Sequence, residues 1–156
     1  MEKIKRYMAQ MKDIQVHTIP RPTMVGRKEK VRIQEMPELG TVIAKVDSGA
    51  YSSTIHCPYI EEIKHSNRKS ILRYSPFDDR SHIYETDSYS RRKVTSSNGI
   101  SEERFVIDVH LQLGSHVFSG HVTLSNRGTM RHSMLIGRKF LSEHNLLVNV
   151  NQRFMV

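Results

Sequence analysis

An aspartate, a serine and a glycine follow one another at positions 47 to 49, directly after an alternating apolar pattern at Val42, Ala44 and Val46. A strand ending at Asp47 would present the carboxylate rigidly, beside a hydroxyl that can hydrogen-bond to it. Gly49 allows the backbone to turn and approach closely. An aspartic peptidase needs this order to activate water, although Asp-Ser-Gly is also an ordinary turn sequence.

A second pattern lies about ninety residues further on, where residues 134–141 read hydrophobic-hydrophobic-Gly-Arg-x-x-Leu. It predicts an apolar strand that ends at Gly137 and a short helix from Arg138 to about His144. A hairpin is expected before it, because residues 105–113 and 116–124 have strand-like patterns on either side of a Gly-Ser turn.

The elements that must position these residues are mostly strands. Many short strands, one short helix and no internal repeat predict an all-β fold, a small and mostly antiparallel closed β-barrel. The polar stretch at residues 58–92 is expected to hold two weak strands joined by a loop. A last strand pair is expected at residues 146–150 and 153–156, with an apolar end that could pair across an interface.

The Asp-Ser-Gly sequence and residues 134–141 together resemble the retropepsins, the retroviral-type aspartic peptidases. A closer likeness is to a bacterial retropepsin-like family that is often called the ATP-dependent zinc proteases and includes the RimB peptidases. Four blocks in the right order carry this closer likeness: residues 44–50, 93–99 with 102–104, 123–127, and 134–141. The resemblance covers nearly all of residues 25–156 and implies the retropepsin-like (acid protease) barrel.

The resemblance also implies a mechanism in which two carboxylates activate one water molecule. One carboxylate acts as general base while the other, protonated, polarises the scissile carbonyl. The chain has one Asp-Ser-Gly sequence, so a retropepsin-like site requires a homodimer with Asp47 from each subunit on a twofold axis. Asp47, Ser48 and Gly49 are therefore the candidate catalytic residues.

The stretch around residues 96–104 corresponds to the retropepsin flap, a hairpin that closes over substrate. The candidate substrate-binding residues flank Asp47 or belong to this flap: Ala50, Tyr51, Ser96, Ser97, Asn98, Gly99, Glu103 and Arg104. Arg138 is the expected structural support of the catalytic loop. The resemblance implies an acid or an arginine where this chain has Tyr51, which leaves the partner of Arg138 open.

Positive charge is concentrated at the amino terminus. Residues 1–32 hold nine basic and three acidic residues, so six of the eight net positive charges lie there. Apolar residues at helical spacing predict that residues 1–24 are a basic amphipathic extension and linker ahead of a peptidase domain at 25–156. The extension lacks a signal-like apolar run, so a cytoplasmic protein without a membrane span is expected.

An acidic, glutamate-rich peptide is the expected substrate. The resemblance implies glutamate tails added to a ribosomal protein, and the cations Arg91, Arg92, Lys93 and Arg104 near the flap fit such a ligand. Nucleic acid fits the charge equally well, but an aromatic content of 7% with no tryptophan gives little for base stacking. Nucleic acid is therefore not the favoured partner.

Two other functions stay open. A barrel that remains monomeric has one carboxylate per site and could be a non-catalytic, basic binding module. A zinc-dependent peptidase is less favoured, because the chain has no His-Glu-x-x-His pair for zinc and no phosphate-binding loop for ATP. No cofactor or metal is therefore expected, although His110, His116 and His121 could form a fortuitous metal site on the hairpin.

Overall fold

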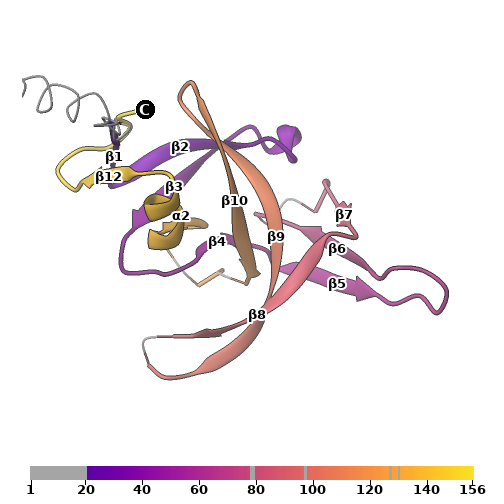
Figure 1. The fold of residues 1–156 in the computed structure, drawn as a ribbon. Helices are drawn as coiled ribbons and strands as arrows, with labels where there is room; N and C mark the ends of the chain where they lie inside the picture. The colour runs from indigo at the N-terminus through magenta and orange to yellow at the C-terminus, as the bar shows by residue number, and fades with distance from the viewer. Residues whose placement is uncertain (1–20, 78–79, 97, 127, 130) are drawn as a thin grey trace, which may run out of the picture.

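The computed structural model describes residues 21–156 except 78–79, 97, 127 and 130 (Figure 1). The expected amphipathic helix of the extension and Ser97 of the flap lie outside the described residues. No helix of the described part is long and apolar enough to cross a membrane. In chain order, the described elements are β1 (Thr23–Gly26), β2 (Lys28–Ile33), the 3-10 helix η2 (Pro37–Leu39), β3 (Thr41–Asp47), β4 (Ser53–His56), β5 (Tyr59–Ile63), β6 (Ile71–Ser75), β7 (Tyr84–Thr86), β8 (Tyr89–Thr95), β9 (Ser101–Leu113), β10 (His116–Ser125), β11 (Met134–Gly137), α2 (Arg138–Glu143) and β12 (Leu146–Asn149).

Six of the strands close a ring. The order is β10, β4, β11, β3, β2 and β9, and β9 pairs again with β10. The pairs β3 with β11 and β4 with β10 are parallel, whereas the other pairs of the ring are antiparallel. The structure therefore confirms the predicted all-β barrel, with the expected short helix α2 directly after β11.

The core of the barrel follows the alternation seen in the sequence. In β2 the side chains of Val31 and Ile33 are buried, while Lys30 and Arg32, which alternate with them, are exposed. Alternate residues of β3 and of the β9–β10 hairpin also point inward, and residues of β11 and α2 close the interior. Because successive strand residues face opposite sides, this pattern fixes which face of each strand meets the core.

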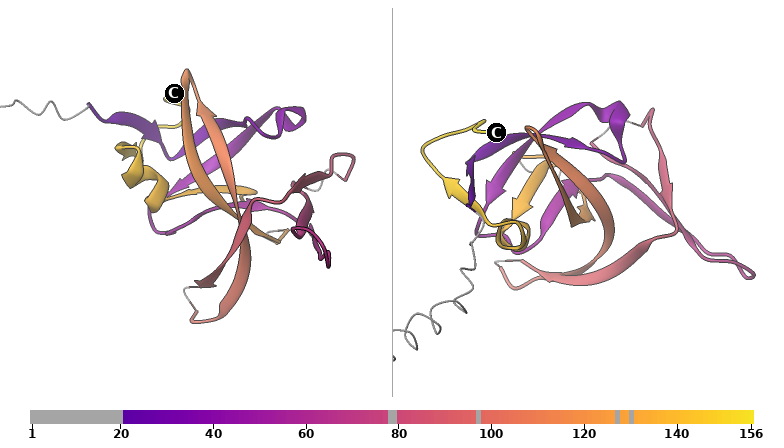
Figure 2. Two further views of the ribbon diagram at one scale, coloured as in Figure 1. Left: turned by 45° about the vertical axis from the view of Figure 1, so that its right-hand side comes forward. Right: turned by 45° about the horizontal axis from the view of Figure 1, so that its top comes forward.

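Strand β9 belongs both to the barrel and to a hairpin with β8. Its second half pairs with β10 in the barrel, and its first half pairs with β8 over residues 101–107. The β8–β9 hairpin therefore extends beyond the barrel, as Figures 1 and 2 show. This hairpin contains the residues expected to form the flap.

The prediction of two weak strands at residues 58–92 was wrong. This stretch contains β5, β6 and β7, which form a separate three-stranded antiparallel sheet, together with the start of β8. On one face of this sheet Arg73 stands opposite both Glu61 and Glu85, and on the other Tyr74 stacks on Tyr84. Favourable pairs between strands stabilise such a sheet although each strand alone has a weak apolar pattern.

The expected strand pair at the carboxyl end was also wrong in its second half. Strand β12 pairs in parallel with β1, and residues 153–156 form no strand. The Phe154 amide donates to the carbonyl oxygen of Lys28, and the amides of Met155 and Val156 donate to the Glu29 carboxylate. These backbone donors are used within the chain, so they are not available to pair across an interface.

Glu29 is a buried carboxylate that holds three backbone donors. Its side chain is 0% exposed and accepts hydrogen bonds from the amides of Gly26 (2.6 Å), Met155 (2.9 Å) and Val156 (3.4 Å). Gly26 is required beside it, because a Cβ there would lie 2.6 Å from the Cα of Arg153. Glu29 thus attaches the last residues of the chain to β1 and β2.

We predict that Glu29→Ala lowers the free energy of unfolding by about 2–4 kcal/mol, because it leaves buried amide groups without an acceptor. Chemical denaturation monitored by circular dichroism measures the change. Glu85→Ala removes a half-exposed carboxylate paired with Arg73 and should cost less than about 1 kcal/mol. Equal stabilities of the Glu29→Ala and Glu85→Ala variants would contradict the role of Glu29.

Candidate active site

Asp47 is the last residue of β3, where the chain leaves the barrel in a tight turn. The Gly49 amide donates to Oδ1 of Asp47 at 3.1 Å, and the Ala50 amide donates to the Asp47 carbonyl oxygen at 3.2 Å. The Asp47 side chain is 26% exposed, so the carboxylate is held by the turn and still reaches solvent.

Lys45, two residues earlier and on the same side of β3, forms an ion pair with Asp47. Its ammonium group donates to Oδ2 at 3.1 Å. Burial on its own would raise the pKa of Asp47, but the Lys45 ammonium and the amides of Gly49 and Ala50 outweigh it and hold the pKa below its usual value. Asp47 is therefore ionised in the single chain near neutral pH.

Gly137 brings strand β11 against the segment that follows Asp47. The parallel register places Gly137 beside Asp47, and the Gly137 amide donates to the Ser53 hydroxyl at 3.0 Å. A Cβ at this position would lie 2.5 Å from the carbonyl carbon of Ser52, a distance that no side chain tolerates without a backbone shift. A glycine is thus required where the strand and the loop meet.

Arg138 supports the loop through its backbone and its side chain. Its amide donates to the Ala50 carbonyl at 2.8 Å, and the next amide, of Lys139, donates to the Tyr51 carbonyl at 3.1 Å. The first free N–H groups of α2 thereby find acceptors in the loop. The guanidinium lies 3.4 Å from the carbonyl oxygens of Ser48 and Gly49 and 5.5 Å from the centre of the Tyr51 ring.

These contacts identify the partners of the Arg138 guanidinium in a chain that has a tyrosine at position 51. The guanidinium binds main-chain oxygens and the face of an aromatic ring. Among the described residues no carboxylate forms an ion pair with Arg138. Within the described part of the chain, the positive charge of Arg138 is therefore not balanced by an ion pair.

The β8–β9 hairpin ends in a narrow turn at residues 96–100. The Ser96 amide donates to the Ile100 carbonyl at 2.8 Å, and the Gly99 amide donates to the Ser96 carbonyl at 2.9 Å. Gly99 has a φ of 83°, which favours glycine. At the base of the hairpin, Arg92 donates to the Ser52 hydroxyl at 3.1 Å and so connects β8 to the loop after Asp47.

An open groove of about 860 Å³ lies between the β8–β9 hairpin and the loop after Asp47. Asp47 is the one carboxylate among the residues that line it in the described part of the chain. The cations of the lining come from four parts of the chain: Lys45, Arg92, Lys93, Arg104, Arg131 and Arg138. The groove therefore combines one carboxylate with a strongly positive surface.

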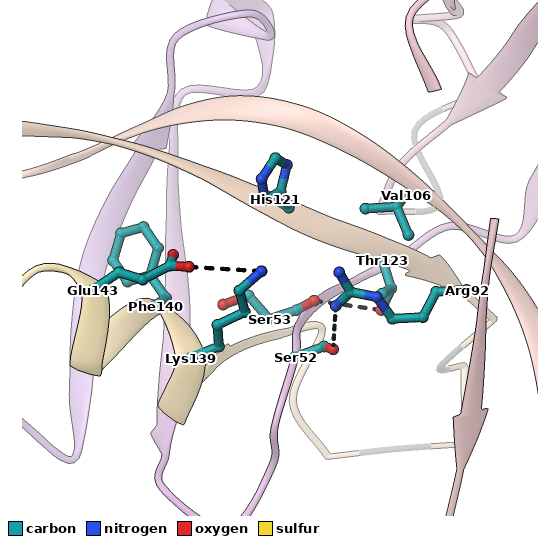
Figure 3. Close-up of a pocket in the computed structure, with 9 residues that line it drawn as sticks. All are labelled: Ser52, Ser53, Arg92, Val106, His121, Thr123, Lys139, Phe140 and Glu143. Atoms are coloured by element: carbon teal, nitrogen blue, oxygen red, sulfur yellow. Dashed lines mark hydrogen bonds and ion pairs between the residues drawn. The ribbon is translucent and has the colours of Figure 1, made fainter. Parts of the chain in front are cut away.

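A much smaller cavity of about 10 Å³, roughly the space of one water molecule, lies behind the groove (Figure 3). It lies between Ser52 and Ser53 at the start of β4, the β8–β9 hairpin, β10 and α2. Arg92 and Ser52 line both the cavity and the groove. They thus form part of the wall between the two.

The structure gathers most of the sequence-predicted site residues in the groove. The predicted residues that line it are Asp47, Gly49, Ala50, Tyr51, Ser96, Arg104 and Arg138. Ser48 is exposed beside it, and Asn98 and Gly99 lie at the exposed end of the hairpin. Glu103 does not line the groove, and neither does Arg91, with which it forms an ion pair at 2.7 Å.

Sequence reasoning missed several residues of the groove. Arg131, His132 and Leu135 reach it from β11 and the segment before it. No local pattern singles out Arg131 or His132. The contribution of Leu135 follows only from the pairing of β11 with β3, which places it beside Lys45.

The three histidines of the β9–β10 hairpin each contact a different partner. Nδ1 of His110 lies 2.5 Å from Glu35, and Nδ1 of His121 lies 2.5 Å from Asp108. His116 stacks on Phe118. In the described part of the chain, no group of three or more histidine, cysteine or acidic side chains could hold a metal ion, so these residues do not fit a zinc site.

We predict that Lys45→Gln raises the pKa of Asp47, because the substitution removes the cation that stabilises the carboxylate. Carboxyl carbon chemical shifts followed over a pH titration by NMR measure the change. Lys30→Gln is the control, because it removes the same charge from the outer face of β2, where Lys30 lies over Phe154. An Asp47 titration that is the same in wild type and Lys45→Gln would contradict the ion pair.

Comparison with known proteins places this arrangement in context. A protein from Legionella pneumophila, Lpg0085, described as of unknown function, has a similar fold, with a TM-score of 0.63 and 25% identity over 85% of this chain and 97% of that one. Proteins named probable alpha-L-glutamate ligase share 36% identity in Shewanella halifaxensis and 34% in Desulfotalea psychrophila, over 71% and 69% of this chain. The chain spans only about a quarter of the length of these relatives, 26% and 24% respectively.

The family comparison covers almost all of the described residues. Residues 24–156 match the model of the RimB-like family, described as "Retropepsin-like aspartic endopeptidase RimB". The match includes the Asp47 turn, the β8–β9 hairpin and the Gly137–Arg138 junction. The resemblance stated from the sequence is thus confirmed, and the chain belongs to the RimB-like family of retropepsin-like aspartic endopeptidases.

Proposed function

We propose that this chain is an aspartic peptidase that works as a homodimer, with one Asp47 carboxylate from each copy. The observation that carries the proposal is that the groove of one chain contains a single carboxylate, Asp47, held at the end of a barrel strand. A second copy related by a twofold axis supplies the second carboxylate with the same supporting turn. The groove is open, which leaves room for a peptide and a partner.

In the proposed mechanism the two carboxylates share one proton. The ionised Asp47 takes a proton from water while the protonated one donates a hydrogen bond to the scissile carbonyl. Two adjacent negative charges oppose each other, so the pair titrates with two separated apparent pKa values. A Lys45 beside each Asp47 lowers both apparent pKa values and so shifts the single-proton state toward acidic pH.

An acidic peptide is the substrate class that the charge of the groove supports. Six cations line the groove against one carboxylate, so each glutamate of a bound peptide meets a favourable potential. Relatives over most of this chain are named probable alpha-L-glutamate ligases, which links this type of domain to glutamate chemistry in those proteins. We propose glutamate-rich tails, such as those added to a ribosomal protein, as the substrate.

A non-catalytic binding module is the alternative that one observation favours. In the single chain Lys45 already neutralises Asp47, so a monomer would offer a positive groove without a free carboxylate. Such a module would bind acidic peptides and leave them uncut. Hydrolysis and its dependence on Asp47 separate the two functions.

We predict that Asp47→Asn lowers hydrolysis of a glutamate-rich peptide by about 10²–10⁴-fold, because the amide cannot accept the proton of water. Asp108→Asn, which alters an exposed carboxylate paired with His121, is the control and should retain wild-type activity. Product formation is measured by mass spectrometry. Full activity of Asp47→Asn would exclude the aspartic mechanism, and loss of wild-type activity in EDTA with recovery on added zinc would favour the metal-dependent one.

Mixing the two proteins tests the shared dyad. An equal mixture of wild type and Asp47→Asn, after subunit exchange, should retain about a quarter of the wild-type activity, because a mixed dimer has one carboxylate. A peptidase that works as a monomer would retain about half. Sedimentation at the assay concentration provides the dimer fraction that this comparison requires.

We also predict that glutamate-rich peptides are cleaved with a higher kcat/KM than lysine-rich peptides of equal length. The difference should shrink when the ionic strength rises from about 0.01 M to about 0.15 M, since salt screens exposed charges. Peptides of alternating Glu and Lys control for length and polarity. Equal rates at both ionic strengths would refute the acidic substrate and leave the catalytic role of Asp47 standing.

A further inference from the structure

Two arginines stand directly opposite each other on the groove side of the β8–β9 hairpin. Arg92 of β8 and Arg104 of β9 are cross-strand partners in the antiparallel register. Both are half-buried and both line the groove. Like charges placed directly opposite in a sheet are destabilising, so this pair needs a compensating negative charge.

Within the described part of the chain, one carboxylate, that of Glu102, compensates the charge of the two arginines. Glu102, two residues before Arg104 and on the same side of β9, forms an ion pair with the Arg104 guanidinium. Arg92 donates to the neutral hydroxyl of Ser52 at 3.1 Å and forms no ion pair with a described carboxylate. The two guanidiniums therefore have one carboxylate between them.

The opposite face of the same hairpin is neutralised differently. Arg91 pairs with Glu103 at 2.7 Å and also with Glu62 of β5. One arginine there has two carboxylates, whereas on the groove side two arginines have one. Lys93 stands opposite Glu103 on this other face, so each cross-strand pair of charged residues there combines opposite charges, and among the β8–β9 pairs Arg92 and Arg104 are the one pair of like charges.

The position of Glu102 makes its carboxylate replaceable. The Glu102 side chain is 53% exposed, whereas the Arg104 side chain is 18% exposed. Glu102 can turn into solvent and be hydrated, while the guanidinium of Arg104 stays in the wall of the groove. Because only the Glu102 partner of this ion pair is exposed, another carboxylate can replace it from solvent while the Arg104 guanidinium stays paired.

We propose that Arg92 and Arg104 form a carboxylate-binding subsite for a glutamate side chain of the substrate, and that Glu102 occupies this subsite in the free protein. Binding exchanges the carboxylate of Glu102 for that of the peptide. The planar guanidinium groups suit a carboxylate because each can donate two parallel hydrogen bonds. The identity of the ligand as an acidic peptide rests on the proposed function.

Binding to an uncleaving protein tests the subsite separately from catalysis. Asp47→Asn serves as the background, and a fluorescently labelled hexaglutamate peptide is titrated by anisotropy at about 0.01 M ionic strength. Arg104→Gln and Arg92→Gln should each weaken binding about tenfold, because each removes a charge-assisted hydrogen bond. Glu102→Gln should tighten binding about threefold, because it removes the competing carboxylate.

Matched variants separate the subsite from overall charge. Arg91→Gln removes the same charge from the other face of β8 and should change affinity less than twofold, about the effect of a screened distant charge. Glu85→Gln removes an acid outside the groove, paired with Arg73, and should likewise leave affinity unchanged. The gain from Glu102→Gln should disappear when Arg104→Gln is also present.

Two results of the binding titrations would overturn the proposal. Equal loss of affinity in Arg91→Gln and Arg104→Gln would show a general charge effect, and unchanged or weaker binding by Glu102→Gln would remove the competing role of Glu102. If a Gln variant does not fold, Arg104→Lys tests the same point, because it keeps the charge and loses the paired donors. The expected binding pattern together with no cleavage by the wild-type protein would support the subsite and refute the peptidase function. Cleavage by the wild-type protein, with no dependence of binding on Arg104, would do the reverse.

Discussion

The close approach of β11 to the loop after Asp47 is the constraint on which the site depends. Gly137 stands beside Asp47 in the parallel register, and its missing side chain lets the two backbones meet at the Ser52–Ser53 segment. The next two amides of the chain then bind loop carbonyls, and the Arg138 guanidinium lies against the turn. A strand junction therefore holds the loop that follows the carboxylate.

The cations around the groove differ in what they contact. Lys45 stabilises the ionised Asp47, and Arg138 supports the turn through carbonyl oxygens and an aromatic face. Arg92 and Arg104 lie on the hairpin above, with a single carboxylate between them. A positive groove that is incompletely neutralised is unfavourable for the empty protein and favourable for an anionic ligand, which connects the electrostatics of the fold to the proposed substrate.

The family assignment gives these features a chemical frame. In the proposed dyad each copy of the chain supplies one carboxylate, so activity would depend on the oligomeric state. The hairpin that lines the groove is anchored at its base by the bond from Arg92 to Ser52. The side chain of Arg92 therefore connects the hairpin to the loop after Asp47.

Much of the fold and part of the site could be predicted from local sequence. Alternation fixed the inward faces of β2 and β3, and Asp47-Ser48-Gly49 with Gly137-Arg138 marked the two ends of the catalytic junction. The strands of residues 58–92 could not be predicted in this way, because Arg73 and Tyr74 are stabilised by partners on neighbouring strands. The carboxyl end was mispredicted for a similar reason, since its amides bind the buried side chain of Glu29 from the other end of the domain.

The sequence by itself determined the strand faces, the carboxylate and the glycines, because these depend on residue type and on spacing along the chain. Only the tertiary structure decided which cations line the groove and which are neutralised elsewhere. Arg91 and Arg92 are neighbours in sequence, yet one pairs with two carboxylates outside the groove and the other faces Arg104 within it. That difference arises from strand pairing, which brings together charges that are far apart along the chain and places successive side chains on opposite faces.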